Sequence, residues 1–400
     1  MITKIISNLW ILFIVIGMIW QIFLFFLGRK KHVKPVNREK RKYHYCILIP
    51  ARDESTVIED LLKSIQNQTK QISFKDVYII VESDKDKTVG IAEKYEANIF
   101  IRKRLELQRK GYALDECIKS ILDQGKSYDA YFIFDADDIL EKNFIEKMDQ
   151  SYQAGYMACT GYCDVKNGND NVISACSALT FTMINTIGNR YKNSYSQNIT
   201  LSGTGYFIAK ELIEEWSGFP FHTLTEDYQQ SLYLLIEGYS THYNEEAIFY
   251  DEQPTDMHTS VQQRIRWIRG YLDSRRMYHN MMKEKIGKDI LKNYYLIPKY
   301  FGIKPLLLII IGIILGVFTQ MNLTSTLKNG ILIFLVVYLL LFLVTVFMIY
   351  LEKGRISISR EMKIKACFFN PLFLASYLYC AVVAITRKTI VWTKIEHNKH

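Results

Sequence analysis

The chain has 400 residues, of which 49% are hydrophobic and 23% are charged, and its 50 Lys and Arg against 41 Asp and Glu give a net charge of +9. The basic excess lies in the runs 29–42 and 353–365, beside long apolar stretches, where Lys and Arg hold helix ends at an anionic, cytoplasmic lipid surface. The central part of the chain has no basic stripe interleaved with aromatic residues, so the charge does not indicate a nucleic-acid partner.

Four stretches contain no Asp, Glu, Lys or Arg and are 21 to 23 residues long, and about 20 apolar residues suffice to cross a bilayer. They exclude a purely soluble protein, and the hydrophilic block between the first and the second excludes a transporter with most of its mass in lipid. The first stretch is too long for the apolar core of a signal peptide and lacks a small-residue cleavage site, so a retained anchor fits better. The basic flank that follows it places the central block in the cytoplasm. The stretches are Ile5–Leu27, Pro305–Leu327, Asn329–Leu351 and Ala366–Thr386.

The central block begins with apolar runs that alternate with segments of helical spacing. This alternation predicts an α/β fold in which a parallel sheet carries helices on both faces. In such sheets the reactive residues collect in loops at the carboxyl ends of the strands. The expected strands are Tyr45–Pro50, Asp76–Glu82, Ala97–Ile101 and Ala130–Phe134, and the expected helices are Glu54–Gln68, Thr88–Tyr95 and Tyr112–Leu122.

Two glycine-containing segments are weaker signals for a phosphate site. Arg109-Lys110-Gly111 places cations and a glycine where a loop enters a helix, as phosphate binding requires. Ser202-Gly203-Thr204-Gly205 resembles the start of a dinucleotide fingerprint, but no third glycine follows at the required spacing.

Three carboxylates follow the strand Ala130–Phe134 within four residues, at Asp135, Asp137 and Asp138. Such a cluster needs a compensating cation, because neighbouring carboxylates repel one another. Asp135 and Asp137 could both face one divalent ion, and Mg²⁺ typically takes one or two carboxylates together with substrate phosphates and water. A solvated acidic turn that caps the next helix is the alternative.

Thr225, Glu226 and Asp227 precede the helical run Tyr228–Glu237. A threonine N-cap followed by acids that the helix dipole favours explains this pattern structurally. In the functional interpretation, one of the two carboxylates is a general base, for which position within hydrogen-bond reach of the acceptor is the first requirement.

Gln263, Arg266 and Trp267 lie in a helical segment shortly before the second apolar stretch. The planar, always charged guanidinium of Arg266 suits the oxygens of a diphosphate, and Trp267 offers an apolar face for a sugar ring. An interfacial helix with Arg and Trp at headgroup level is the alternative.

The last three stretches continue the topology. Pro305–Leu327 and Asn329–Leu351 would cross outward and back, with the basic run 353–365 returning to the cytoplasm. The stretch Ala366–Thr386 either spans or, because Asn370-Pro371 lies near its start, forms a kinked, re-entrant or interfacial helix.

The motifs together resemble those of the membrane-embedded family 2 glycosyltransferases, such as cellulose, hyaluronan, chitin and poly-N-acetylglucosamine synthases. The resemblance covers about Tyr43–Gly270 and the flanking helices. It implies a GT-A, Rossmann-like cytosolic domain at 29–270, a transmembrane anchor at 1–28, interfacial helices at 271–304 and a C-terminal region at 305–400 with about three transmembrane helices. The motifs are Ile49-Pro-Ala-Arg-Asp53-Glu, Lys110-Gly-x-Ala-Leu, Asp135-x-Asp137, Ser202-Gly-Thr-Gly, Thr225-Glu-Asp227 and Gln263-x-x-Arg266-Trp267.

The resemblance also implies roles for individual residues. Asp227 would be the base on the acceptor hydroxyl, with Glu226 beside it. Asp135 and Asp137 would hold Mg²⁺ or Mn²⁺ and the diphosphate. Among the substrate-binding positions, Lys110 would lie near the donor phosphates, Arg266 on the pyrophosphate, Trp267 on the acceptor sugar with Gln263 placing its helix, and Asp53 near the uridine. This chain has Glu82 and Asp84 where the family usually has one aspartate that reads uracil, and either acid could substitute.

The expected activity is the inverting transfer of a hexose from a UDP-sugar, UDP-N-acetylglucosamine or UDP-glucose, to a growing β-linked polysaccharide. The expected location is the cell membrane, with several spans, a cytoplasmic catalytic domain, membrane lipids around it and accessory subunits as possible partners. A non-processive enzyme that adds one sugar to a lipid or short acceptor is the enzymatic alternative. A scaffold that only binds a nucleotide or a partner is the non-enzymatic one.

Overall fold

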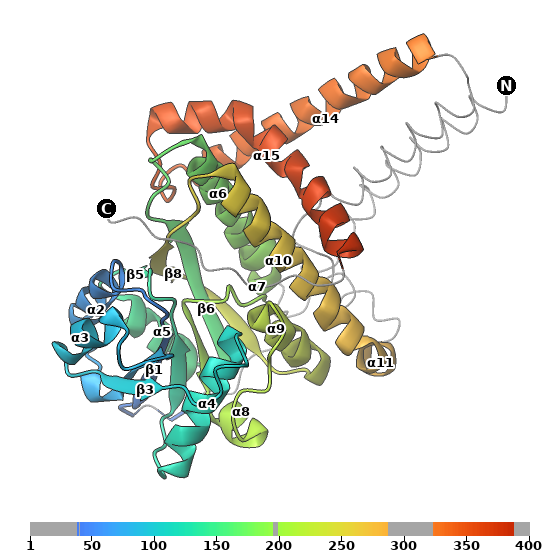
Figure 1. Cartoon of the computed structure of the whole chain (residues 1–400). Coiled ribbons are helices and arrows are strands. Elements are labelled where there is room, and N and C mark those ends of the chain that lie inside the picture. Colours follow the sequence, from blue (N-terminus) through green and yellow to red (C-terminus); the bar gives the residue numbers. More distant parts are fainter. Residues whose placement is uncertain (1–37, 40, 195–198, 287–322, 388–400) are drawn as a thin grey trace.

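The computed structural model describes residues 38–39, 41–194, 199–286 and 323–387. Within them, strands and helices form one α/β domain from which two long C-terminal helices extend (Figure 1). The strands are β1 (Tyr45–Pro50), β2 (Val77–Val81), β3 (Asn98–Ile101), β4 (Ala130–Ile133), β5 (Ile139–Leu140), β6 (Ala158–Val165), β7 (Tyr206–Ala209) and β8 (Thr241–Asp251). The α-helices are α2 (Ile58–Gln66), α3 (Lys87–Glu93), α4 (Lys110–Asp123), α5 (Phe144–Gln153), α6 (Val172–Met183), α7 (Tyr191–Ser194), α8 (Lys210–Trp216), α9 (Glu226–Glu237), α10 (Met257–Met277), α11 (His279–Met281), α14 (Leu323–Leu351) and α15 (Arg360–Thr386). A 3₁₀ turn, η2 (Phe74–Asp76), and two π-helical segments, η3 (Ile184–Arg190) and η4 (Met282–Ile286), complete the described elements.

The sheet has eight strands in the order β3-β2-β1-β4-β7-β6-β8-β5. The four strands expected from the sequence, β1 to β4, pair in parallel as predicted. The other half departs from a purely parallel sheet, because β7 runs antiparallel to both β4 and β6, and β5 runs antiparallel to β8. The sheet is therefore mixed: β1 to β4 are parallel as predicted, and β6 and β8 form a further parallel pair in the other half.

Burial on both faces explains why the strands are continuous apolar runs. Along β1, Ile47 and Ile49 pack into the core on one face of the sheet, and Cys46 and Leu48 pack into the core on the other. The first face is covered mainly by α2, α3 and α5, and the second by α4, α8 and α9.

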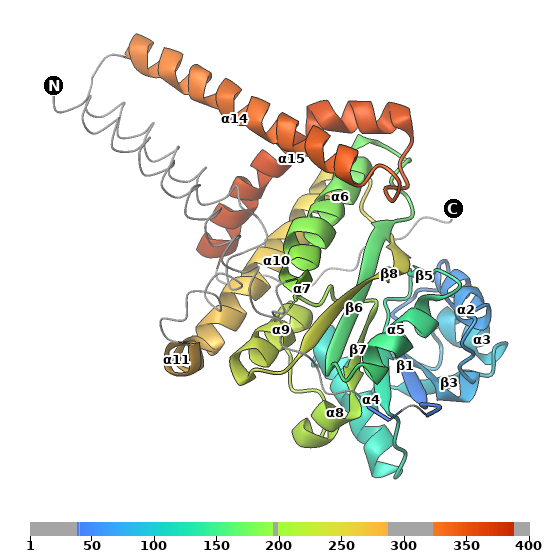
Figure 2. The same ribbon diagram turned by 180° about the vertical axis from the view of Figure 1, so that it is seen from behind.

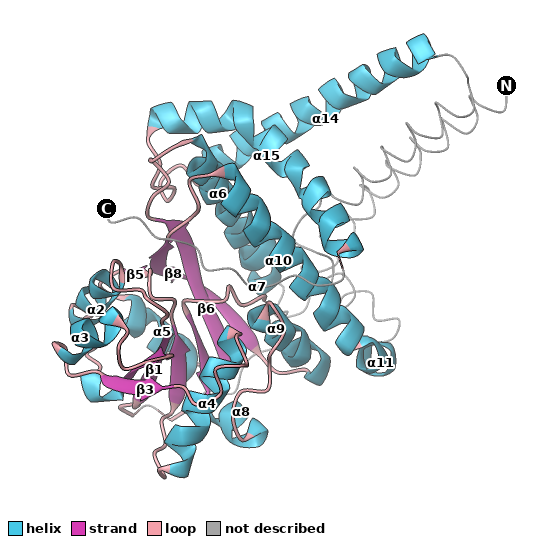
Figure 3. Ribbon diagram, in the orientation of Figure 1, coloured by secondary structure: helices cyan, strands magenta, loops and turns pink. Residues whose placement is uncertain are grey.

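The two C-terminal helices are each long and apolar enough to cross a membrane, by length and composition alone. They contain the predicted stretches Asn329–Leu351 and Ala366–Thr386, whereas Ile5–Leu27 and most of Pro305–Leu327 lie outside the described residues. Helix α14 projects away from the sheet in both views, and most of its surface is exposed (Figure 2). Helix α15 packs against α6 and α10 (Figure 3). It contains Pro371 and bends along its length, as expected where proline removes a helix hydrogen bond.

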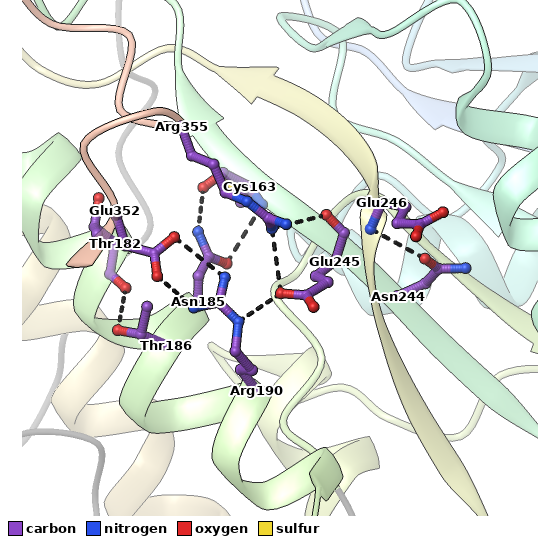
Figure 4. Close-up of polar contacts among 10 residues, drawn as sticks. All are labelled: Cys163, Thr182, Asn185, Thr186, Arg190, Asn244, Glu245, Glu246, Glu352 and Arg355. Carbon is purple, nitrogen blue, oxygen red and sulfur yellow. Dashed lines mark hydrogen bonds and ion pairs between the residues drawn. The ribbon is translucent and has the colours of Figure 1, made fainter.

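The segment that joins α14 to α15 is docked into the α/β domain. Arg190 of η3 forms ion pairs with Glu352 at the end of α14 and with Glu245 of β8, and Arg355 pairs with the same Glu245 (Figure 4). Further along, Ile356 and Ile358 are buried in the main core. The two C-terminal helices are therefore attached to the domain through their connecting loop as well as through helix packing.

Candidate active site

Lys110 connects two of the segments singled out in the sequence. Its ammonium forms an ion pair with Asp135, directly after β4, and donates a hydrogen bond to the carbonyl of Gly203 at 2.8 Å. Burial alone would lower the pKa of Lys110, but the carboxylates of Asp135 and Glu226 outweigh it and raise that pKa to about 12. The lysine is therefore a fixed positive charge at the start of α4.

The glycine-rich segment 202–205 positions residues of the acidic cluster. The hydroxyl of Thr204 accepts a hydrogen bond from the backbone N–H of Asp135 at 2.8 Å and donates one to Asp138. Gly203 has a φ of +84°, and a side chain there would lie 3.5 Å from Oδ2 of Asp227. The segment thus brings the loop after β4 beside the first turn of α9, a role that the incomplete dinucleotide pattern did not indicate.

Glu226 and Asp227 form the first turn of α9. Thr225 occupies the N-cap position and both acids lie in the first turn, as the pattern predicts, but the threonine side chain makes no capping hydrogen bond. Glu226 is 7% exposed. Burial raises its pKa, the positive charge of Lys110 opposes this, and the negative charge of Asp227 adds to it, which leaves the pKa of Glu226 at about 7.

Helix α10 brings the third motif to the same place. Gly270 packs so closely on Thr225 that a methyl group there would meet the threonine hydroxyl at 2.2 Å. Burial lowers the pKa of Arg266, and the carboxylates of Glu226, Asp135 and Asp227 oppose that effect. The structure therefore places two cations, Lys110 and Arg266, within electrostatic reach of carboxylates from the loop after β4 and from the first turn of α9.

The other two residues of that motif are half-buried on α10. Trp267 packs against the main core and meets the ring of Phe181 edge-on, with ring centroids 6.3 Å apart. Gln263 lies one turn earlier on the same helix.

A group of carboxylates that could hold a metal ion consists of Asp137, Asp138 and Asp251, with one oxygen of each within 4.8 Å of the others. Pairing of Ile139 in β5 with Tyr250 in β8 brings Asp251 next to the loop after β4. Burial and the charges of the neighbouring carboxylates raise the pKa of Asp138 and of Asp251. Oδ1 of Asp138 is buried and has no hydrogen-bond partner, so this donor set of hard oxygens fits a divalent cation.

The sequence-based metal pair was Asp135 and Asp137, and the structure divides it. Asp137 belongs to the carboxylate group, whereas Asp135 pairs with Lys110. Asp251 was not identified from the sequence. Its only signal there was an acid at the end of the apolar run of β8, and its partner strand β5 has just two residues.

The three candidates for base recognition follow β1 and β2. Glu82 forms ion pairs with Arg52 at 3.2 Å and with Arg102 at 3.5 Å. Asp53 is exposed with a φ of +54°, and its N–H donates to Asp86 at 2.8 Å. Asp84 is exposed, and the hydroxyl of Ser83 donates to it. All three lie at the carboxyl edge of the parallel strands, where an α/β sheet binds its ligand.

Residues 43–270 match the model of a family described as glycosyltransferase like family 2. The chain belongs to this family. It is therefore a glycosyltransferase with a GT-A-like α/β domain.

Two curated relatives are similar to this family 2 glycosyltransferase. The probable glycosyltransferase YdaM of Bacillus subtilis (strain 168) is 25% identical over 286 residues, which cover 64% of this chain and 65% of YdaM. Poly-beta-1,6-N-acetyl-D-glucosamine synthase of Staphylococcus aureus (strain COL) is 25% identical over 229 residues, 56% of this chain and 53% of that enzyme. The matches thus span about half to two thirds of the relatives' lengths.

Among solved structures, the mannosyltransferase PcManGT from Pyrobaculum calidifontis, in complex with GDP-Man and Mn²⁺, superimposes with a TM-score of 0.61. The alignment covers 96% of this family 2 glycosyltransferase and 99% of PcManGT at 12% sequence identity. At this identity the likeness shows a shared fold.

The arrangement in this family 2 glycosyltransferase is suited to a negatively charged donor and a hydroxyl acceptor. Lys110 and Arg266 offer positive charge to an anion, and a carboxylate group able to hold a cation includes Asp137 and Asp138 of the loop after β4. Asp227 offers a carboxylate at the first turn of α9.

Proposed function

We propose that this glycosyltransferase transfers a sugar from a UDP-sugar, UDP-N-acetylglucosamine or UDP-glucose, with inversion at the anomeric carbon, to a growing β-linked cell-surface polysaccharide. The observation that carries the proposal is the convergence of Lys110, Arg266 and Asp227 from three separate elements. Charges of both signs gathered in this way are what the transfer requires, because the leaving diphosphate gains negative charge while the acceptor hydroxyl loses a proton.

In this proposal Asp227 accepts the proton of the acceptor hydroxyl as that oxygen attacks the anomeric carbon. The C–O bond forms as the bond to the diphosphate breaks, and the electron pair leaves with UDP. Arg266 and Lys110 stabilise the charge on the departing diphosphate. Glu226 interacts electrostatically with Lys110, Arg266 and Asp227, so its protonation state affects all three groups.

We assign the divalent cation, Mg²⁺ or Mn²⁺, to Asp137, Asp138 and Asp251, with Asp135 held toward the diphosphate through Lys110. A bound cation would add Lewis-acid stabilisation of the diphosphate oxygens. The uridine would lie over the ends of β1 and β2, near Asp53 and Asp84. Because both oxygens of Glu82 are engaged by arginines, we expect Asp84 to be the more accessible of the two acids for uracil.

We further propose that α14 and α15 cross the cell membrane, together with the first apolar stretch, so that the catalytic domain lies at its cytoplasmic face. The membrane lipids would then surround the exposed side chains of α14. Similarity to a poly-N-acetylglucosamine synthase supports a polysaccharide product and N-acetylglucosamine as the first donor to test. Accessory subunits would be needed if one chain does not export its product.

The test is a panel of nucleotide sugars with the full chain in detergent or lipid nanodiscs and Mg²⁺ or Mn²⁺. UDP-N-acetylglucosamine, UDP-glucose and GDP-mannose are each offered, and nucleotide release and product size are measured. We expect UDP release and a ladder of long products, both lost in Asp227→Asn. One product of fixed small size would support transfer of a single sugar to a lipid or short acceptor. Nucleotide release from GDP-mannose alone would overturn the UDP assignment.

A control variant is needed to show that Asp227→Asn loses activity because the base is missing and not because the protein unfolds. The matched control is Asp273→Asn on α10, an acid that pairs with Arg269 of the same helix one turn earlier. Asp227→Asn should retain UDP binding and lose about 10²–10⁴-fold in turnover, the range for a general base. Unchanged turnover in Asp227→Asn would remove the proposed base.

A further inference from the structure

Helix α10 lies between the candidate active site and the C-terminal helices. One side of it contacts α9 through Gly270 and Thr225, and another side contacts α15. Figures 1 and 3 show α6, α10 and α15 running beside one another. The position of α10, and with it that of Arg266, therefore depends in part on the contact between α10 and α15.

Arg264 is one of two arginines of α10 that donate hydrogen bonds to α15, and Arg269 is the other. Arg264 is 1% exposed and is the largest fully buried side chain in the described part of the chain. One terminal nitrogen donates to the carbonyl of Phe373 at 3.2 Å and to the hydroxyl of Ser376 at 2.6 Å. The guanidinium also lies over the rings of Phe373 and Tyr377, with centroid distances of 4.2 and 4.7 Å.

The charge of Arg264 is balanced without a carboxylate. None of the ion pairs found among the described residues includes it, and its partners are carbonyls, a hydroxyl, the sulfur of Met257 and aromatic faces. Burying a guanidinium in this way contributes little net stability, because desolvation offsets most of the gain, and well-packed apolar residues often replace buried charges without loss. The effect of Arg264 is therefore mainly geometric: directional hydrogen bonds fix the rotation and register of α10 on α15.

The α15 region is tied to the α/β domain before the first turn of the helix, and it is bonded to α10 a second time at its last turn. Before its first turn, Asn169 bonds to the backbone of both Ser357 and Ser359, at 3.0 and 2.7 Å. At its last turn, Arg269 of α10 donates to the carbonyls of Ala384 and Arg387, at 3.3 and 2.9 Å. Arg264 binds the helix between these two points.

We infer that Arg264 is a positioning residue that sets the place of Arg266 by bonding α10 to α15. The inference rests on the proposed function, in which Arg266 stabilises the diphosphate. Residues two apart on a helix project to different sides, so Arg264 can bind α15 while Arg266 faces Glu226, Asp135 and Asp227. A shift of α10 by about 1 Å would misplace Arg266, and misplacement on that scale can cost about 10²-fold in rate.

The experiment compares Arg264→Met with Arg276→Met, a matched control in which an exposed arginine of the same helix is replaced. We expect kcat for UDP release to fall about 10–10²-fold in Arg264→Met with KM for the donor changed less than threefold, and the control to match wild type. In a double-mutant cycle, the variant that carries both Arg264→Met and Arg266→Met should be no slower than Arg266→Met alone. Additive losses would overturn the inference, because they would mean that Arg264 does not act through Arg266.

A second variant covers the case in which Arg264→Met does not fold. Ser376→Ala removes one acceptor of Arg264 from α15 and leaves the arginine in place. It should lower kcat a few-fold, and it should have no further effect in the Arg266→Met background. A separate loss in that background would contradict the inference.

Hydrogen exchange separates failure of this inference from failure of the proposed function. Whether or not any nucleotide sugar is a substrate, the amides of residues 265–270 should exchange faster in Ser376→Ala and Arg264→Met than in wild type and in Arg276→Met. Unchanged exchange in these amides would overturn the positioning role. Absence of UDP release from wild type would instead reject the proposed function.

Discussion

The ammonium of Lys110 is ion-paired with the carboxylate of Asp135, and the same ammonium donates to the carbonyl of Gly203. Lys110 begins α4, Asp135 follows β4, and Gly203 precedes β7. One cation thus holds together three segments that are far apart in sequence. Its charge also reaches Glu226 at the start of α9.

Replacing Lys110 by methionine should keep the fold of α4 and remove this charge. Asp135 would lose its partner, and a diphosphate would lose one of its two cations, so we expect kcat/KM for the UDP-sugar to fall about 10²–10³-fold, as for loss of one preorganised electrostatic donor. UDP-release kinetics measure the change. The control is Lys119→Met, which removes a half-exposed lysine that pairs with Asp115 on the same helix, and it should change kcat/KM less than twofold. Equal effects of the two substitutions would contradict a site-specific role for Lys110.

Protonation of Glu226 should make stability depend on pH in a defined window. Its pKa is about 7 in the folded protein against 4.5 for an unperturbed glutamate, so the folded state binds more protons between these values. The stabilising contribution of the neutral carboxyl is complete below about pH 4.5 and is lost as the pH rises through about 7. Glu226→Gln lacks this loss, so its melting temperature relative to wild type should increase from pH 5 to pH 8 and then stay constant.

Two further variants test whether Glu226 is the group that causes this pH dependence of stability. Asp227→Asn removes a negative charge that raises the pKa of Glu226, so the midpoint of the pH dependence should move to lower pH. Glu214→Gln replaces a half-exposed glutamate on α8 and should leave the wild-type pH profile unchanged. A profile for Glu226→Gln that runs parallel to wild type at all pH values would show that another group titrates there.

The sequence was sufficient for the features that local pattern determines. The apolar runs of β1 to β4 and the intervening helices were predicted because each run is short and continuously apolar, and β1, β2 and β4 are buried on both faces. The motifs around Lys110, Asp227 and Arg266 were identified because each stands at the start of a helix or on one. Features that depend on distant pairing were not predictable. Asp251 joins Asp137 only through the pairing of β5 with β8, and β7 enters the sheet antiparallel after a long helical excursion.

Local sequence pattern was insufficient where tertiary packing determines the contacts of a side chain. Thr225 has the sequence context of a capping residue, yet Gly270 of α10 packs against its side chain and no capping bond forms. Arg264 is the neighbour of the motif residue Gln263. The sequence does not indicate its role, because nothing in it tells which face of α10 meets α15. Its contacts with Phe373 and Ser376 appear only once the C-terminal helices are in place.

Asp251 should contribute to cation binding if the three carboxylates hold the metal. Asp251→Asn keeps the size of the side chain and removes one charged oxygen ligand. Mn²⁺ affinity in the presence of UDP, measured by electron paramagnetic resonance or calorimetry, should fall at least about tenfold, a loss that even residues outside the ligand shell can cause. Asp123→Asn at the exposed end of α4 is the control and should bind Mn²⁺ as wild type does. Wild-type affinity in Asp251→Asn would confine the metal site to the loop after β4.

Arg190 should contribute to stability by neutralising the end of α14. Glu352 is 4% exposed in side-chain area, and both of its oxygens are engaged by Arg190. Arg190→Met would leave that carboxylate buried without its cation, at a cost of about 1–3 kcal/mol. Thermal unfolding of the full chain in detergent measures the loss. Lys365→Met removes one member of the exposed pair Lys365–Glu361 and should lower the melting temperature much less than Arg190→Met does.

The double variant Arg190→Met/Glu352→Met distinguishes a buried charge pair from simple loss of packing. Because two apolar side chains of similar length avoid the desolvation of both charges, we expect it to regain most of the stability that Arg190→Met loses. The remaining Arg355–Glu245 pair would still tie the connecting loop to β8. A double variant less stable than Arg190→Met would mean that Glu352 has a further partner that matters more than Arg190.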